Sequence, residues 1–405
     1  MLKTPKRNWI SFAFLLIIVG STISVGGVSF DSTSQRNKVI STIIASSDEF
    51  MFDPLIEFTD EGIISALDLK NHLFGNGTEQ DPYILKDLSL NIQDYRPEYE
   101  LYIRFSYSNK HVRIENCSFK YSYSSYSWPG DPSGGIYIHG SKNVHINNCT
   151  FLKMSVFPTA IYNSSHIIIS NSSYYLNDNI AITVLGGDFI SVLNSTFKST
   201  AGGIKMKDVN NSYIDGNSLI LNQNPGIIFT GNSKNISISH NHIKQNTLGI
   251  VISGSEERWY SNGVLTSETI KFVENVSIFQ NIVEYSTLQG ISIWKTINCS
   301  IWGNLLNNNI ENGILLDEVD KVLVQENNIS HNLKYGVNIV NSTNINLIDN
   351  YFTQNGISNI FGKYEDSLKT SSFKWGYWLF ASLGVIAVPI LIIVVKKYQN
   401  QKKTI

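Results

Sequence analysis

Three consecutive stretches of 23 residues decide the fold of this chain: NIVEYSTLQGISIWKTINCSIWG (281–303), NLLNNNIENGILLDEVDKVLVQE (304–326) and NNISHNLKYGVNIVNSTNINLID (327–349). Each stretch begins with Asn, reaches Gly nine residues later, and contains short segments in which apolar and polar residues alternate. Such alternation predicts β-strands. Three strands per repeat, joined by Asn or Gly turns, predict one coil of a solenoid, meaning one full circuit of the chain.

The same spacing extends towards the N-terminus. The leading Asn recurs at Asn148, Asn171, Asn194 and Asn217, with Asn241 one residue late. A large apolar residue follows two or three positions after each Asn of the series: Phe151, Tyr174, Phe197, Leu219, Ile243, Val283, Leu306, Ile329 and Phe352. Glycines open apolar strands at Gly203, Gly226, Gly249, Gly290, Gly313 and Gly336, and a further Asn series runs through Asn211, Asn235, Asn275, Asn298 and Asn344. Asn suits these turns because it tolerates the left-handed backbone and can hydrogen-bond to its copies along the axis.

A single coil cannot bury its own apolar face, so the coils must stack. The sequence therefore predicts an all-β parallel β-helix of about ten coils, which at roughly 4.8 Å per coil is a rod about 45–50 Å long. Leucine-rich repeats and propeller blades are excluded, because the leucine frame is absent and blades have longer periods.

The stretch GNGTEQDPYIL (75–85) carries a family resemblance. It is similar to the G-x-G-T-x-x-[ND]-P-Y-x-I motif that opens membrane-anchored, mostly archaeal members of the NosD-like and pectate-lyase-like group, and the repeats of residues 50 to 360 resemble that group's right-handed parallel β-helix. The resemblance implies the fold and carbohydrate binding. It does not select an activity, because the group includes lyases, hydrolases, epimerases and a copper-site maturation factor.

A short helix is expected just before this motif. Thr59 or Asp60 can N-cap it, with Ile63, Ile64 and Leu67 as its apolar face. We expect it to cover the open edge of the first coil.

Both ends of the chain predict membrane segments. Lys3, Lys6 and Arg7 precede an apolar run, which is typical of a signal peptide or an uncleaved signal anchor. Residues 375–395 carry no charge and cover about 31 Å as a helix, enough to cross a bilayer. Because basic residues favour the cytoplasmic side, residues 31–374 are expected outside the cell membrane. The predicted organisation is a signal peptide or anchor (1–30), a linker and cap (31–74), the β-helix (75–360), a linker (361–374), a transmembrane helix (375–395) and a cytoplasmic basic tail (396–405).

Two insertions interrupt the repeat, and function is expected there because solenoid insertions form surface loops. Residues 120–134 include Tyr126 and Trp128, and residues 255–273 include Glu256, Glu257, Arg258, Trp259 and Tyr260. Exposed aromatic rings beside polar groups suit stacking on sugars. The alternative is that these rings pack the loops onto the rod.

Other chemistry is weakly represented. Asp317, Glu318 and Asp320, with Glu256 and Glu257, are the best candidates for the paired carboxylates of a polysaccharide-active enzyme, although short acidic runs are usually solvated turns. His240 and His242 are expected on one strand face, but no metal site or cofactor is predicted. The net charge of −2 gives no footprint for nucleic acid.

The three cysteines form no CxxC pair. Cys117 and Cys149 occupy equivalent places in consecutive coils, which allows either a disulfide or stacked buried thiols, and Cys299 is expected to be unpaired.

The favoured function is a membrane-anchored cell-surface glycoprotein that binds glycans or envelope components without catalysis. Glycosylation sequons, among them those at Asn76, Asn163, Asn235, Asn275, Asn298 and Asn341, fit an outside location. The alternatives are a polysaccharide lyase or hydrolase, a NosD-like copper-site accessory protein, and a structural spacer.

Overall fold

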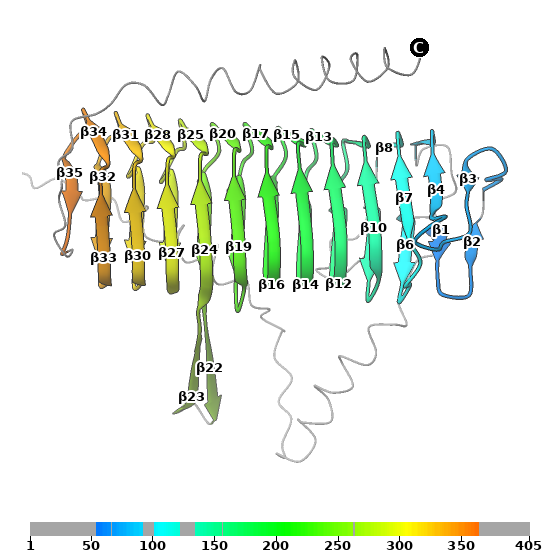
Figure 1. Cartoon of the computed structure of the whole chain (residues 1–405), viewed down its shortest axis with the longest axis horizontal. Helices are drawn as coiled ribbons and strands as arrows, with labels where there is room; N and C mark the ends of the chain where they lie inside the picture. Colours follow the sequence, from blue (N-terminus) through cyan, green and yellow to red (C-terminus); the bar gives the residue numbers. More distant parts are fainter. Residues whose placement is uncertain are drawn as a thin grey trace, which may run out of the picture. The chain divides into compact units, whose positions relative to one another are not determined.

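The computed structural model describes residues 54–65, 67–91, 101–121, 134–155, 157–261 and 264–363. They form a right-handed parallel β-solenoid (Figure 1), in which one sheet of short strands, with one strand for each coil, has eleven strands, close to the ten coils expected. Over these residues there is no helix, and therefore none long and apolar enough to cross a membrane. The segments 1–30 and 375–395, for which membrane insertion is predicted, lie outside the described residues.

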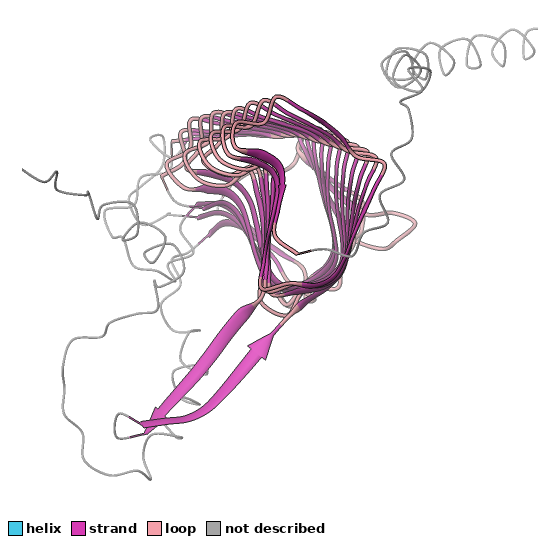
Figure 2. Cartoon of the chain, turned by 90° about the vertical axis from the view of Figure 1, so that its left-hand side faces the viewer, coloured by secondary structure: helices cyan, strands magenta, loops and turns pink. Residues whose placement is uncertain are grey.

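Three faces enclose one apolar core (Figure 2). The first face contains β1 (Pro54–Phe58), β6 (Leu101–Ser106), β9 (Gly134–His139), the first parts of β12 (Phe157–Ser170), β14 (Ile180–Leu193) and β16 (Gly202–Asp215), then β18 (Ile227–Thr230), β21 (Ile250–Ser253), β26 (Ile291–Trp294), β29 (Ile314–Asp317), β32 (Tyr335–Val340) and β35 (Ser358–Phe361). The second face contains β4 (Tyr83–Lys86), β7 (Val112–Glu115), β10 (Lys142–Asn147), the later parts of β12, β14 and β16, then β19 (Lys234–Ser239), β24 (Val273–Phe279), β27 (Thr296–Trp302), β30 (Asp320–Gln325) and β33 (Thr343–Ile348).

The third face consists of three-residue strands: β5 (Ser89–Asn91), β8 (Ser118–Lys120), β11 (Thr150–Leu152), β13 (Ser173–Tyr175), β15 (Thr196–Lys198), β17 (Ser218–Ile220), β20 (His242–Lys244), β25 (Ile282–Glu284), β28 (Leu305–Asn307), β31 (Asn328–Ser330) and β34 (Tyr351–Thr353). Their central residues all point into the core, as the apolar series of the repeat predicts. Near the N-terminus these residues are aromatic: Phe151 stacks on Tyr174 with ring centroids 4.5 Å apart, and Tyr174 stacks on Phe197 at 4.9 Å. Burial raises the pKa of Tyr174, whose hydroxyl hydrogen-bonds to that of Thr159 at 3.0 Å.

The predicted capping helix is wrong. Residues 63–65 form β2 (Ile63–Ser65), which turns back and pairs antiparallel with β1. Gly62 has a φ of +152°, a conformation that interrupts a helix, and Ile64 is 66% exposed instead of packing on a coil. β3 (Leu73–Phe74) pairs antiparallel with β4, so folded-back strands occupy the N-terminal edges of two faces. Parallel stacking already begins at β1, which pairs with β6, ahead of residue 75 where the first coil was expected.

Asp60 has a different role from a helix cap. Its carboxylate accepts hydrogen bonds from the backbone N–H of Asn109 at 2.7 Å and from that residue's side-chain amide at 2.9 Å. These two bonds lower the pKa of Asp60. The residue therefore ties the β1–β2 turn to the next coil.

The glycine series marks the closest approach between coils. A Cβ on Gly249 would lie 2.2 Å from the carbonyl oxygen of Gly290 and 2.3 Å from Cγ1 of Val283. A Cβ on Gly203 would similarly lie 2.2 Å from the carbonyl oxygen of Gly226. Close packing, and no special backbone angle, therefore requires glycine at these positions.

The leading Asn series divides into two columns. Asn194 has a φ of 48° and aligns with Gly216, whereas Asn217 aligns with the buried Ser195. Ser195 and Asn217 are 22 residues apart and Asn217 and Asn241 are 24 apart, so a short coil precedes a long one. The prediction that Asn148, Asn171 and Asn194 belong to the stack of Asn217 is therefore wrong. The first three occupy left-handed turns, and the buried stack consists of Asn217, Asn241, Asn281, Asn304 and Asn327, with the half-buried Asn350 at its end.

The other Asn series is a left-handed turn column on the surface, as expected. Asn235 donates to Oδ1 of Asn211 at 2.9 Å, Asn275 donates to Asn235 at 3.0 Å, and Asn298 donates to Asn275 at 2.7 Å. Consecutive coils are thus linked by side-chain amides inside and outside the rod.

Cys117, Cys149 and Cys299 are buried free thiols. Cys117 and Cys149 align in consecutive coils, where they immediately precede β8 and β11. Of the two arrangements that the sequence allowed for this pair, the structure has the stacked thiols. Cys299 lies apart on β27, as expected.

Candidate functional site

The second insertion forms a β-hairpin. β22 (Ser255–Ser261) and β23 (Val264–Lys271) pair antiparallel and project from the corner between the first and second faces (Figures 1 and 2). Gly254 permits the exit, since a Cβ there would lie 2.3 Å from the carbonyl oxygen of Lys271 and 2.6 Å from that of Lys295. Tyr126 and Trp128 of the first insertion lie outside the described residues.

A buried lysine holds the root of this hairpin. The side chain of Lys295 is 3% exposed, and its ammonium contacts Oε1 of Glu256 and lies 2.9 Å from Oε2 of Glu318. It also lies over the ring of Trp294, 4.7 Å from the centroid. Burial alone would lower the pKa of Lys295, but the hydrogen bonds to both carboxylates outweigh burial and raise it. We call this arrangement of Glu256, Lys295 and Glu318 the hairpin clamp.

The other predicted ligand residues lie further along the hairpin. Glu257 pairs with Lys271 at 2.5 Å across the two strands. The backbone places Arg258 opposite Glu268 and Trp259 opposite Ser267, and the pairing shifts before Tyr260. Glu256 and Glu257 therefore take part in ion pairs at the hairpin root, and ligand contact by the five residues stays a prediction.

The three acidic residues Asp317, Glu318 and Asp320 lie in different environments. The pKa of Asp317 is raised by burial and by the negative Glu318, and its Oδ1 is buried without a hydrogen-bond partner. The pKa of Glu318 is lowered by its bond to Lys295. Asp320 points elsewhere and accepts from Thr343 at 2.7 Å and from Asn344 at 2.6 Å. Glu256 and Glu318 thus share one ammonium group, and neither Asp317 nor Asp320 has an ion pair with it among the described contacts.

An aromatic row that the sequence did not reveal lies on the first face, on and next to β6, β9 and β12. The ring centroids of Tyr137 and Tyr162 are 5.3 Å apart, those of Tyr137 and His139 are 6.2 Å apart, and those of Tyr107 and His139 are 4.8 Å apart. Tyr107 is 58% exposed. The alternation of Tyr137 and His139 along one strand was the available signal, because both positions point outward. We call these four residues the aromatic row.

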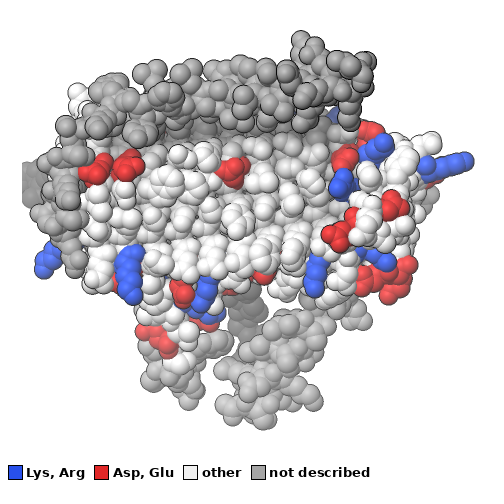
Figure 3. Space-filling model, viewed as in Figure 1, with Lys and Arg blue, Asp and Glu red and all other residues white. Residues whose placement is uncertain are grey.

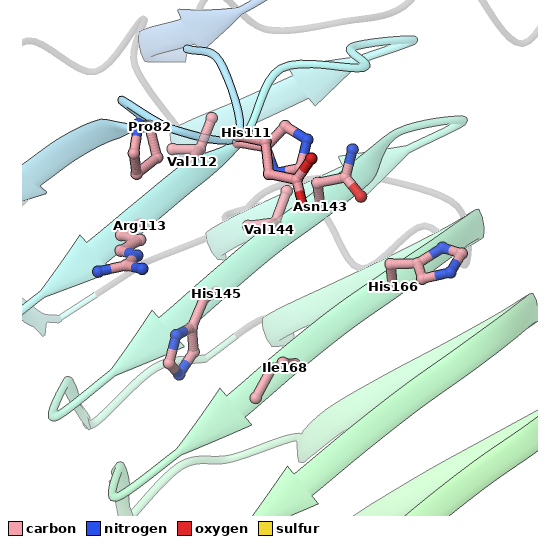
Figure 4. A pocket seen from close by; sticks show the side chains of 10 residues that line it. Pro82, His111, Val112, Arg113, Asn143, Val144, His145, His166 and Ile168 are labelled. Atoms are coloured by element: carbon pink, nitrogen blue, oxygen red, sulfur yellow. The ribbon is translucent and has the colours of Figure 1, made fainter. Parts of the chain in front are cut away.

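A shallow groove of about 260 Å³ lies on the second face, across β4, β7, β10 and β12 (Figure 4). Arg113 and His145 occupy adjacent positions of one outward column, between Ile84 and Ile168. Nε2 of His145 lies 2.8 Å from the hydroxyl of Ser170. Burial and the neighbouring positive charge of Arg113 lower the pKa of His145. Glu79, Pro82, His111, Asn143 and His166 also line the groove.

The two histidines around Asn241 diverge, contrary to the expectation that they share a strand face. His240 lies 2.7 Å from Asp215 of the preceding coil, and His242 lies 3.1 Å from Glu284 of the following coil. Nowhere in the described part of the chain do three His, Cys, Asp or Glu side chains gather as metal ligands would.

Charge is sparse on the face seen in Figure 3, where Lys, Arg, Asp and Glu gather near its edges and its N-terminal end. A broad middle region of this face is without charge. Neutral polar and apolar side chains therefore dominate this part of the surface.

Comparison with known proteins agrees with the fold. Residues 102–271 match the family described as the right handed beta helix region, and residues 232–367 match the periplasmic copper-binding protein NosD family. The chain is similar to the right-handed β-helix, NosD-like group. No curated protein matches it.

Two solved structures show the same fold at low sequence identity. The surface adhesin PfbA of Streptococcus pneumoniae is 15% identical, with a TM-score of 0.52, 86% of this chain covered and 95% of that one. A double mutant of the periplasmic alginate epimerase AlgG is 14% identical, with a TM-score of 0.50, 87% of this chain covered and 99% of that one. At such identities the likeness concerns the fold alone.

Proposed function

We propose that this protein is an extracytoplasmic, membrane-anchored surface β-helix that binds glycans or other envelope components without catalysis. The observation that carries the proposal is the aromatic row. Its rings come from neighbouring coils, and Tyr137 and His139 belong to β9, the strand that follows the insertion carrying Tyr126 and Trp128 in the sequence. Rings held by a rigid sheet suit stacking on sugars, because little conformational entropy is lost on binding.

The proposed location draws on the family match and on the sequence. The NosD family is described as periplasmic. The asparagines of three glycosylation sequons, Asn163, Asn235 and Asn298, have exposed side chains. The apolar segments 1–30 and 375–395 supply the proposed anchoring to the membrane.

Glycan-array binding of the full chain tests the proposal. We expect binding to at least one saccharide, and at least a roughly tenfold loss of affinity when both Tyr137 and Tyr162 are replaced by Ala. The matched control is Tyr213→Ala, which removes a ring that is 49% exposed on the second face. Absence of binding to every glycan, or equal affinity of the double variant and the parent, rejects the proposal.

A catalytic alternative has one specific observation in its favour. Asp317 and Glu318 are adjacent carboxyls whose pKa values move in opposite directions, which is how enzymes separate a general acid from a general base. This alternative predicts release of reducing ends or unsaturated products from a polysaccharide, and loss of that activity in Asp317→Asn. Activity that persists in the variant would exclude these residues.

A copper-site accessory role does not fit the residues present in the described part of the chain. His240 and His242 point to different coils and each contacts a carboxylate. Copper sites need imidazole or sulfur ligands that converge on one point.

A further inference from the structure

The outer surface of the third face presents two columns of side chains. In each coil the last residue of the short strand points outward, and the next residue sits in a left-handed turn beside it. Hydrogen bonds between coils keep these turns in line: the N–H of Lys153 donates to the carbonyl oxygen of Tyr175 at 3.0 Å. In the next coil the N–H of Leu176 donates to the carbonyl oxygen of Lys198 at 3.1 Å. The two columns therefore run side by side along the third face, whose strands line the top of the rod in Figure 1.

Over the coils of β11, β13, β15 and β17, basic and large apolar residues fill most of both columns. The residues that form this lysine–leucine strip are Lys153, Tyr175, Leu176, Lys198, Ile220 and Leu221. Leu176 is 51% exposed, Leu221 is 46% exposed, and both lysines are exposed as well. None of the outward positions of these four strands and of the turns that follow them holds an acidic residue. The strip is therefore both cationic and apolar.

The residues next to the strip leave its lysines available to a partner. Asp178 is the acidic residue nearest to the strip in sequence, two positions after Leu176 and beyond the turn. In the coil that follows the strip, Lys244 pairs with Glu284 at 3.1 Å, so the strip ends where a carboxylate enters the same column. Anionic groups outside the chain can therefore meet the lysines of the strip.

The two leucines are unexpected at their positions. Leu176 and Leu221 have φ angles of 53° and 58°, a left-handed conformation that residues other than Gly, Asn and Asp adopt at a cost. The turns that precede β11, β13 and β15 have the same conformation and use Asn148, Asn171 and Asn194. A half-exposed leucine also gains less from burial than a leucine in the core. The fold itself thus favours Asn at both turns, and the leucines point to a partner that takes up apolar side chains.

We propose that the lysine–leucine strip rests on the surface of a bilayer that contains anionic lipids. Lysine stems lie along apolar surface while their ammonium groups reach lipid phosphates, and leucine and tyrosine side chains enter the boundary between headgroups and acyl chains. An acidic polymer would match the lysines but leave the leucines exposed to water, so lipid fits the whole strip better. The proposal goes beyond glycan binding, because the aromatic row lies on a different face of the rod.

Fluorescence of a labelled full chain tests the proposal. The chain is reconstituted into vesicles of phosphatidylcholine, with or without phosphatidylglycerol, and Ser199→Cys carries an environment-sensitive fluorophore in the turn between Lys198 and the next coil. The native cysteines are buried, so the introduced thiol reacts first. With phosphatidylglycerol we expect blue-shifted emission and quenching by nitroxide-labelled lipids. The same fluorophore at Ser277→Cys, on the second face, should be quenched by neither type of vesicle.

Charge variants separate lipid docking from other effects. Each lysine near an anionic surface favours the docked state roughly fivefold, so Lys153→Gln with Lys198→Gln should lower the ratio of docked to undocked rods about 25-fold. Raising the salt to about 0.5 M should act in the same direction, because it screens the attraction. The matched control, Lys142→Gln with Lys207→Gln, removes two charges from exposed positions on the other faces and should leave the ratio within about twofold.

The leucines supply a second readout with a sign that a structural role would not give. Leu176→Asn with Leu221→Asn should weaken the quenching of the fluorophore at residue 199, because the apolar contact with lipid is lost. The same variant should unfold at an unchanged or higher temperature, because Asn tolerates the left-handed turn better than Leu. Loss of thermal stability with unchanged quenching would assign the leucines to the fold and contradict the proposal.

Three further results would overturn the proposal. The first is equal emission and quenching at residue 199 in both types of vesicle. The second is blue-shifted emission that lipid nitroxides do not quench, which would show that protein covers the strip. The third is an equal shift on addition of soluble polyglutamate without vesicles, which would assign the strip to an acidic polymer. Glycan binding is measured separately on the array, so either function can fail without the other.

Discussion

The side-chain amide of Asn304 donates to Oδ1 of Asn327 at 2.9 Å, and the backbone N–H of Asn304 donates to the same oxygen at 2.9 Å. Each member of the buried Asn stack also donates inward to a carbonyl; for Asn304 this is Ile278, at 2.9 Å. One side chain therefore satisfies groups in three coils. Because the stack is buried, water cannot replace these bonds.

Replacing Asn304 by Ala should consequently be severe. It leaves the N–H and side-chain amide of Asn281 without their acceptor and opens a small cavity. We expect a loss of about 2–4 kcal/mol in the free energy of unfolding. The control, Asn298→Gly, removes an exposed amide and keeps a residue that tolerates the φ of 58°, so it should cost under about 1 kcal/mol. Denaturant unfolding of both variants measures the difference, and equal costs would contradict the role of the buried stack.

Gly249→Ala tests the glycine series. The added Cβ meets the carbonyl oxygen of Gly290 at 2.2 Å, which is backbone that cannot rotate away. We expect a loss of about 3 kcal/mol, measured by denaturant unfolding. Gly303→Ala is the control, since it has positive φ but no contact closer than 3.5 Å and should cost only about 1 kcal/mol. A reversed order would show that backbone angle, and not space, selects glycine.

The repeat was predictable because each coil repeats one set of packing constraints. A position such as Gly249 has to be small whatever the neighbouring residues are, so its spacing alone reveals it. The Asn columns were harder to assign. A coil of 22 residues is followed by one of 24, so the average spacing stays at 23 residues. A count in steps of 23 therefore puts Asn194 and Asn217 in one column, although Asn194 lies in a turn and Asn217 lies in the core.

The candidate site was less accessible to such reasoning. Arg113 and His145 are 32 residues apart because an insertion separates them, and only the strand pairing aligns them in one column. Glu256 meets Lys295 through the path of a hairpin, which no periodic pattern encodes. The sequence located the insertion, but it could not indicate that Glu256 anchors the hairpin to Lys295 of the rod.

Lys295→Met should release the root of the hairpin. The substitution leaves Glu256 and Glu318 without their shared cation, but their side chains are 24% and 44% exposed, so water screens part of the loss and we expect a cost of about 1–3 kcal/mol. We expect faster hydrogen exchange at residues 255–257 and 269–271, with the core strands less affected. Lys321→Met is the control, because Lys321 has a similar φ of 55° but is exposed. Unchanged exchange at the hairpin root would mean that backbone pairing alone holds it.

Acid should open the same clamp without a substitution. The pKa of Glu318 is lowered in the folded protein by its bond to Lys295, so its contribution to stability is present above the unfolded value of about 4.3 and is lost as the pH falls through the folded value. The pKa of Lys295 is raised, so its contribution is present below about pH 10.4 and is lost as the pH rises through the folded value. We therefore expect the hairpin root to be protected from hydrogen exchange between roughly pH 5 and pH 10, after correction for intrinsic rates, and to lose protection below about pH 4. In Lys295→Met the root should exchange fast across the whole range, and parent protein whose protection is the same at pH 3 and pH 7 would refute the clamp.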